Sequence, residues 1–185
     1  MRLVNQSKCM SFCCALIFLA VGTFFGPPVH SQDGQLAAPD LAWVTAGLGG
    51  GTGGIAGVLG LDVLKRHHLI SLRGVAVSSG GMFEAGDEYW DAALLYGRAV
   101  RGRRSVVAAS AGLAIVGGKH RGGLLGAPST SLPTSIGLPV AARAAWHPWS
   151  FLGFGIYGFA NVNKEQSFAG AAFAIELGRL RSVGL

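Results

Sequence analysis

The chain has 185 residues and a formal net charge of +6, with 50% hydrophobic and only 13% charged residues. Soluble domains carry about 25% charged residues, so an ordinary water-exposed surface is hard to build from this sequence. The hydrophobic content also excludes an intrinsically disordered chain, and the length favours a single domain.

Residues 1–31 have the pattern of a secretory signal peptide. Arg2 and Lys8 precede an apolar run from Met10 to Phe25, and cleavage is expected after Ser31. The alternative is an uncleaved membrane anchor, which the run disfavours because a spanning helix needs about 20 apolar residues. The three cysteines all lie in this segment, at Cys9, Cys13 and Cys14. The exported chain is therefore expected to have neither disulfides nor a thiolate metal site.

After a short N-terminal segment, residues 32–40, the chain resolves into eight alternating segments. Every second residue is apolar, and the residues between are mostly Gly, Ala or Ser with about one charge per segment, which is the period of a β-strand. The segments are Leu41–Gly51, Ile55–Lys65, Leu69–Ser78, Glu88–Arg98, Ser105–Gly117, Thr134–Trp146, Phe151–Val162 and Ser167–Arg181. In the last segment Phe173, Ile175 and Leu177 form one face, and Glu176 lies on the other.

The connectors alternate between short and long. Residues 66–68, 101–104 and 147–149 are short turns, whereas residues 79–87 and 118–133 are longer. Short turns at one end and long loops at the other are typical of outer-membrane barrels, whose termini lie on the periplasmic side. Ten residues per strand, tilted near 40°, cover roughly 26 Å of a bilayer. The sequence therefore predicts an all-β protein, an eight-stranded antiparallel up-and-down transmembrane β-barrel over residues 41–181, followed by a tail at 182–185.

A soluble lipocalin-like barrel would alternate in the same way but needs a strongly polar outer face. The non-apolar face here is too sparsely charged for solvent, so it is expected to line the lumen of the barrel. Five charges fall on it, namely Asp62, Arg73, Asp91, Arg143 and Glu176. Since unpaired buried charges would cost several kcal/mol each, we expect these side chains to form an ion-pair network that plugs the lumen.

The segment ends carry aromatic and basic residues. The aromatic residues, expected to form girdles at the membrane interface, are Trp43, Trp90, Tyr96, Trp146, Trp149 and Phe151. The basic residues, expected to form a periplasmic rim, are Lys65, Arg66, Arg98, Arg101, Arg103, Arg104, Arg179 and Arg181. The rim suits contact with outer-membrane lipid headgroups, and the alternative is docking of an anionic periplasmic polymer such as peptidoglycan. Nucleic acid is not expected as a partner of an exported membrane barrel.

Three motifs that suggest chemistry are better explained without it. Residues 49–54 formally match a dinucleotide-binding pattern, but strand-like alternation follows where a helix is required. His67 and His68 are adjacent, so on a strand they point to opposite faces, and no further ligand accompanies them. His120 with Ser129 and Ser131 imitates a hydrolase site like that of outer-membrane lipid A deacylases, but without a placed acid. No cofactor, metal site or catalytic residue is therefore predicted.

Four stretches of the chain carry a family resemblance. They are Asp91–Ala99, Ser135–Ala142, Phe151–Asn161 and Gln166–Arg181. These stretches resemble small outer-membrane barrel proteins of Bacteroidota-like bacteria, a group without an assigned activity. The resemblance implies a location in the cell outer membrane and a fold similar to OmpX or the OmpA membrane domain. It also implies the barrel-assembly machinery as a partner, although the chain ends Ser182-Val-Gly-Leu185 and lacks the terminal aromatic residue that this machinery often reads.

These observations predict a non-enzymatic barrel with a side-chain-plugged lumen and a structural or surface-interaction role. Two alternatives remain open. One is a narrow pore or small-ligand carrier, in which the glycine-rich lumen leaves a continuous gap. The other is a lipid-modifying enzyme whose site is carried by the long loops.

Overall fold

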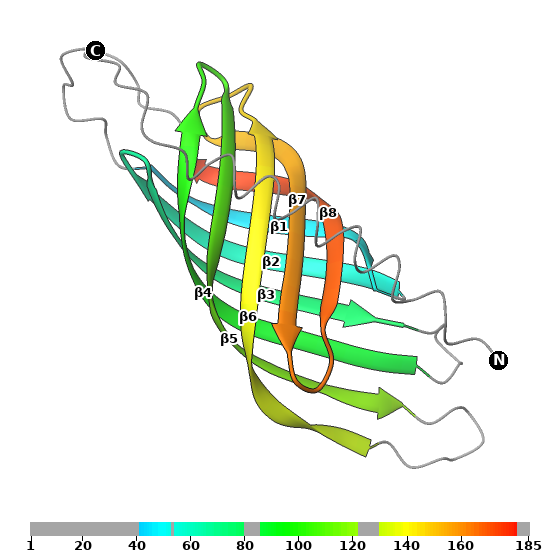
Figure 1. Ribbon diagram of the computed structural model, residues 1–185. Coiled ribbons are helices and arrows are strands. Elements are labelled where there is room, and N and C mark those ends of the chain that lie inside the picture. Colours follow the sequence, from blue (N-terminus) through cyan, green and yellow to red (C-terminus); the bar gives the residue numbers. More distant parts are fainter. Residues whose placement is uncertain (1–40, 53, 80–85, 122–129, 181–185) are drawn as a thin grey trace.

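The computed structural model describes residues 41–52, 54–79, 86–121 and 130–180. The expected signal peptide, the segment 32–40 and the tail 182–185 lie outside this range, as does Arg181. Within it, eight strands close into one barrel, and the ribbon in Figure 1 follows them around the wall in chain order. No helix among the described residues has the length and hydropathy needed to cross a membrane.

Every strand pairs antiparallel with the next one along the chain, and β1 pairs with β8 to close the wall. The strands are β1 (Leu41–Gly51), β2 (Gly54–Lys65), β3 (His68–Ser78), β4 (Gly86–Arg101), β5 (Ser105–Arg121), β6 (Thr130–Trp146), β7 (Leu152–Asn163) and β8 (Phe168–Arg179). The closing ladder runs from the Ala42–Arg179 pair to the Gly51–Gly170 pair. The prediction of an all-β, eight-stranded antiparallel up-and-down barrel is confirmed.

Strands β4, β5 and β6 are longer than the sequence predicts. They span 16, 17 and 17 residues, because residues 86–87, 99–101, 118–121 and 130–133 join the ladders, including Arg101, which was predicted to lie in a turn. A register shift between Val116 and Gly118 absorbs an extra residue there, and the Trp90 ring lies over Gly117. A β-bulge with a small residue therefore lets the chain continue as a strand where glycines and Pro133 predict a break.

The two ends of the barrel differ in their connections. The end that holds the β2–β3, β4–β5 and β6–β7 connections is called the short-turn end, and the opposite end is called the long-loop end. The β2–β3 hairpin closes on the Lys65–His68 pair, and Arg66 within it has a φ of 56°. The β1–β2 connection at the long-loop end is also tight, because the ladder continues to the Gly51–Gly54 pair. Residues 49–51 and 54 are thus strand residues, and β2 follows where a dinucleotide site would require a helix.

The two faces of the wall differ sharply in exposure. Large apolar side chains are exposed on the outer surface of all eight strands, including Leu48 at 74%, Ile136 at 77% and Phe173 at 55%. On the inner face Asp62 and Glu176 are each only 2% exposed. The apolar face of the wall thus points outward, and these two carboxylates point inward. Soluble monomers rarely show so extended an apolar surface, so this outer wall suits hydrocarbon.

Glycines on the two faces are expected to tolerate side chains differently. Gly74 faces outward, and a Cβ there would come no closer than 3.9 Å to the Asp91 carbonyl oxygen. At Gly97, which faces inward, a Cβ would overlap the Ala109 carbonyl and lie 2.5 Å from the Ser110 Cβ. Gly74→Val should raise the free energy of unfolding by about 0.5 to 1 kcal/mol, since valine is the better strand former. Gly97→Val should lower it by about 1 to 3 kcal/mol through overpacking.

Urea titrations of both variants refolded in lipid vesicles would measure these changes. Gly57→Val serves as a second outward variant, because a Cβ at Gly57 has only the end of the Leu48 side chain within reach, at 3.9 Å. If Gly97→Val proved as stable as Gly74→Val, the crowding described inside the barrel would be wrong.

Candidate functional site

The inside of the barrel is filled by three layers of side chains. An apolar layer at the short-turn end consists of Leu41, Trp43, Leu64, Leu69, Ala99, Val106, Ala108 and Leu180. A second apolar layer, toward the long-loop end, includes Val58, Val77, Tyr89, Leu95, Phe159 and Phe168. Between them lies a polar layer that holds Asp62, Arg73, Arg143 and Glu176, and Asp91 joins it from within the second apolar layer through its contact with Arg73. The interior is bulkier than the sequence predicts, because aromatic and leucine side chains join the expected Gly, Ala and Ser.

The five charged residues are contributed by β2, β3, β4, β6 and β8, and all of them are 5% exposed or less. Arg73 Nη2 on β3 donates to Asp91 Oδ2 on the neighbouring β4 at 2.5 Å. Arg143 Nη1 on β6 donates to Asp62 Oδ2 on β2 at 2.8 Å, across the lumen. The first pair therefore joins adjacent strands, and the second ties together strands on different sides of the barrel.

Arg143 is the centre of the polar layer. Besides Asp62, its Nη1 lies 3.5 Å from Glu176 Oε1 on β8, so one guanidinium faces two carboxylates. Its guanidinium carbon also lies 4.6 Å from the centre of the Trp43 ring. A desolvated cation over an indole face contributes a further attraction. The prediction that Trp43 belongs to an interface girdle is therefore wrong, because this ring is 2% exposed and packs inside the barrel.

Several polar residues join this layer without having been predicted as its members. Thr45 Oγ1 donates to Asp62 Oδ2 at 2.8 Å, and the Ser71 hydroxyl donates to Oδ1 of the same carboxylate. Asn161 Nδ2 donates to Asp91 Oδ2 at 2.7 Å. Asp62 and Asp91 thus each accept from a neutral group as well as from an arginine, which lowers the free-energy cost of burying them.

His147 is the most informative of the missed residues. It is 1% exposed, and its Nε2 lies 2.7 Å from Glu176 Oε2. Gly153 makes room for the ring, since a Cβ there would overlap His147 Cδ2. The signal was present in the sequence, because Arg143, Ala145 and His147 continue one period-two face. Pro148 directly after it favoured a turn instead.

Some polar atoms of the layer lack a hydrogen-bond partner within the described part of the protein. They are Trp43 Nε1, Arg73 Nε, Asp91 Oδ1, and Arg143 Nε and Nη2. The space beside Arg143, between Ser110 and Tyr157, is too small to admit a water molecule. The layer therefore combines strong ion pairs with unused donors, in a packed environment.

The outer wall carries a groove of about 750 Å³, in contrast to the packed lumen. Small residues of β1, β2 and β3 form its floor, and Leu48, Trp90 and Phe173 stand at its sides. Trp90, Tyr96, Trp146, Trp149 and Phe151 are all 44% exposed or more, as expected for girdle residues.

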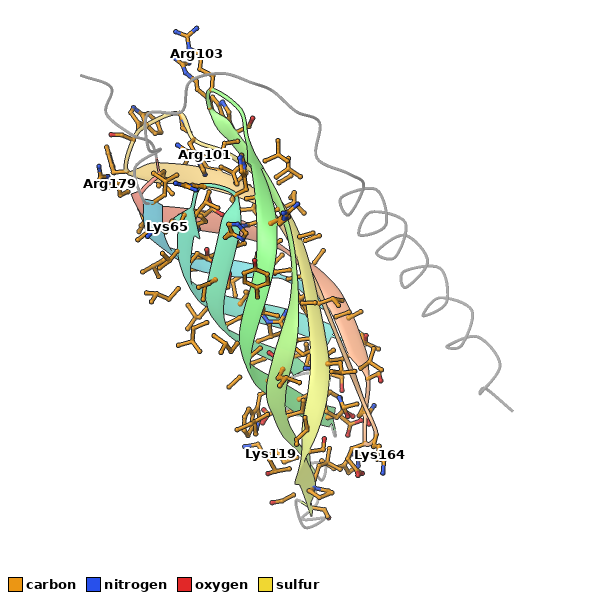
Figure 2. The ribbon with its side chains drawn as sticks, turned by 60° about the vertical axis from the view of Figure 1, so that its left-hand side comes forward. Lys65, Arg101, Arg103, Lys119, Lys164 and Arg179 are labelled. Atoms are coloured by element: carbon orange, nitrogen blue, oxygen red, sulfur yellow. The ribbon has the colours of Figure 1, made fainter. Side chains whose placement is uncertain are left out.

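The predicted basic rim gathers at the short-turn end. Figure 2 shows Lys65, Arg101, Arg103 and Arg179 at one end of the barrel and Lys119 and Lys164 at the other. The remaining described members of the rim lie in or beside the same turns, at Arg66, Arg98 and Arg104. Carboxylates that are not buried, among the described residues, lie only at the long-loop end, at Asp87, Glu88 and Glu165.

The long-loop end places an acid beside His120, which the sequence-based argument lacked. His120 Nδ1 contacts Asp87 Oδ1 across the β4–β5 ladder, on the part of both strands that extends beyond the apolar belt. A hydrogen bond from Tyr89 lowers the pKa of the Asp87 carboxyl, and His120 adds to the lowering. His120 pairs with Thr130, so Ser131 points to the opposite face of β6. Ser129 lies outside the described residues, and those described do not bring a serine to His120.

Metal ligands are not clustered in the described ranges, where no group of three or more His, Cys, Asp or Glu residues could hold an ion. His67 lies in the β2–β3 turn, whereas His68 starts β3 and stacks on Tyr96 with ring centres 5.9 Å apart. The two histidines therefore have different neighbours and do not form a pair of metal ligands.

Comparison with known proteins identifies the fold but not a family. No family model and no curated protein matches the chain. Among solved structures, Neisserial surface protein A (NspA) matches with a TM-score of 0.60 at 11% identity, over 78% of this chain and 99% of that one. Ail, the attachment invasion locus protein of Yersinia pestis, matches with a TM-score of 0.51 at 8% identity, over 77% and 98%. Both similarities concern the barrel, and neither supports a Bacteroidota-like source.

Proposed function

We propose that this protein is a small barrel of the bacterial outer membrane, with a closed lumen and a structural or surface-interaction role. The proposal rests on the contrast between the apolar outer face and the charged inner face of the barrel wall. Exposed Leu, Ile, Val and Phe side chains cover all eight strands outside, while five Asp, Glu and Arg side chains are buried and paired inside. A water-soluble barrel would need the reverse arrangement. In this proposal the short-turn end faces the periplasm.

A surface-interaction role is supported by the kind of protein that shares the fold. NspA is described as a surface protein, and Ail as an attachment invasion locus protein. Because the lumen of such a barrel is closed, a partner can contact only side chains at the two ends of the barrel and in the loops. We infer that the long-loop end is the surface offered to partners outside the cell.

Two simple measurements test the location. The folded barrel should migrate faster than the heated chain on a gel, because a closed, strongly paired barrel resists detergent until it is boiled. The protein should also fractionate with the outer membrane. A single heat-independent band, or recovery with the soluble fraction, would contradict the proposal.

The closed lumen predicts an electrical result. The pure refolded protein should give no steady conductance in a planar bilayer, since the three interior layers fill the barrel. The double variant Arg73→Ala, Arg143→Ala removes the two largest polar side chains of the middle layer but should also give no steps, because the apolar layers on either side still close the barrel. Arg103→Ala, Arg104→Ala removes the same charge from an exposed turn and should remain silent.

A narrow pore or small-ligand carrier is the second candidate. The unused donors of Arg73 and Arg143 favour it, because they could bind an anion if the layer opened. Steady conductance from the unaltered protein, selective for anions, would favour this candidate over the closed barrel. A loop-borne lipid-modifying enzyme would instead require an activity that is lost on replacing His120.

A further inference from the structure

The outer wall at the short-turn end carries a row of cationic side chains that the closed-lumen function does not use. Lys65 at the end of β2 pairs with His68 at the start of β3, and His68 pairs with Arg98 on β4. All three side chains are exposed, and they share the outward face with the neighbouring apolar residues. Adjacent strands are about 4.8 Å apart, so the three groups project side by side within roughly 10 Å. We call Lys65, His68 and Arg98 the cation row.

The position of the row distinguishes it from the other basic residues of the rim. Arg66, Arg103 and Arg104 lie in turns, beyond the ends of the strands. The cation row is part of the wall itself, and the next outward residues above it are Val63, Ile70 and Tyr96. Charges directly below an apolar belt lie where lipid headgroups begin.

Tyr96 holds His68, one member of the cation row, in a defined position. The His68 and Tyr96 rings stack at an interplanar angle of 27°, and His68 Nδ1 lies 2.6 Å from the Tyr96 hydroxyl. This contact holds the imidazole against the wall and directs its Nε2 away from the tyrosine. Tyr96 is 58% exposed and suits the interface, because its ring is apolar and its hydroxyl polar.

Electrostatics favour an anionic occupant. No carboxylate of the described residues is exposed at the short-turn end, whereas Lys65, Arg66, Arg98, Arg101, Arg103, Arg104 and Arg179 are all there. Lysine and arginine side chains so close together repel one another and gain from a shared anion. An arginine fork with a neighbouring ammonium suits phosphate oxygens in particular.

We propose that the cation row binds the phosphate of an anionic phospholipid in the leaflet at the short-turn end. Arg98 and Lys65 flank the phosphate and His68 Nε2 donates to it, while the acyl chains run over Val63, Ile70 and Leu72. This inference rests on the proposed membrane location, and it adds a defined lipid site to it. The other anionic candidate, a soluble polymer, would meet the turn residues first.

The test uses the full chain refolded into nanodiscs that contain equal amounts of phosphatidylglycerol and phosphatidylcholine. Native mass spectrometry then compares how much of each lipid stays bound after the disc is removed. The unaltered protein should retain phosphatidylglycerol in preference. Each cation near a membrane surface raises the affinity for anionic lipid about fivefold. The double variant Lys65→Gln, Arg98→Gln should therefore weaken phosphatidylglycerol retention by roughly 25-fold.

The matched control is Arg103→Gln, Arg104→Gln, which removes the same charge from the β4–β5 turn. It should leave phosphatidylglycerol retention within about threefold of the unaltered protein, because these side chains project beyond the headgroup layer. His68→Gln and Tyr96→Phe should each weaken retention by a smaller factor.

Three outcomes would overturn the proposal. One is equal loss in the cation-row variant and the turn variant, which would indicate a diffuse charge effect. Another is retention of both lipids alike by the unaltered protein. The third is capture of soluble peptidoglycan fragments through the row without any lipid preference, which would assign the row to a polymer. A heat-independent gel band would instead indicate that the membrane location itself is wrong, so the two failures are distinguishable.

Discussion

Replacing Arg143 with methionine is expected to lower the free energy of unfolding by about 3 to 5 kcal/mol. Arg143 is 5% exposed and its guanidinium faces both Asp62 and Glu176, so its loss leaves two carboxylates buried with weaker compensation. Removing one partner of a buried ion pair is costly because the remaining charge is neither solvated nor paired. Urea titration in lipid vesicles, followed by the gel mobility of the folded band, would measure the change.

Two further variants make the Arg143 experiment specific. Arg103→Met removes an arginine from an exposed turn and should change stability by less than about 0.5 kcal/mol. The triple variant Arg143→Met, Asp62→Asn, Glu176→Gln removes the uncompensated charges and should recover most of the loss. If the triple variant were less stable than Arg143→Met alone, buried charge would not be the cause of the destabilisation.

Leu94→Arg is expected to destabilise the barrel by about 2 to 4 kcal/mol in a bilayer. Leu94 is 61% exposed on the outer wall and lies in a row with Leu72 and Leu113 on the neighbouring strands. An arginine on the lipid face costs most at the middle of the hydrocarbon layer and least near the interface. The same titration in vesicles would measure the loss.

The control for Leu94→Arg lies on the same face of the same strand. Val100 is 58% exposed and close to the end of β4, so Val100→Arg should cost only about 0 to 1 kcal/mol. Such a difference between two exposed residues has no explanation in water, where both arginines would be solvated. Equal effects of the two substitutions would therefore contradict a membrane-embedded wall.

The alternation of side chains predicted most of the fold. Period-two segments give strand bounds close to those of β1, β2, β3 and β8, because a wall with hydrocarbon on one side and a packed lumen on the other requires strict alternation. Local rules failed where tertiary pairing overrode them. Pro139 interrupts the β5–β6 ladder, yet it remains paired with Asn161 on β7 and the strand continues. In a closed barrel, a strand that loses hydrogen bonds on one side retains its neighbour on the other.

The polar layer was only partly predictable. Sequence spacing assigns Asp62, Arg73, Asp91, Arg143 and Glu176 to the inner face, but it does not specify their partners. Pairing across the lumen depends on how far the strands are staggered, which no single segment encodes. Trp43 was assigned to the girdle from its position near a strand end, although it shares the inward period of Thr45. His147 was missed because it was assigned to a turn, although its side chain still points inward like those of Arg143 and Ala145 before it.

The ladder between β1 and β8 joins residues 119 to 137 positions apart, from the Gly51–Gly170 pair to the Ala42–Arg179 pair. That contact cannot form until the intervening chain is in place, so the pairing of β1 with β8 carries a large loop-closure entropy cost. Before closure, the first and last strands present unpaired backbone edges, which are templates for aggregation. Synthesis of this protein should consequently depend on a holding chaperone, and a chain shortened by its final strand should be degraded rather than accumulate.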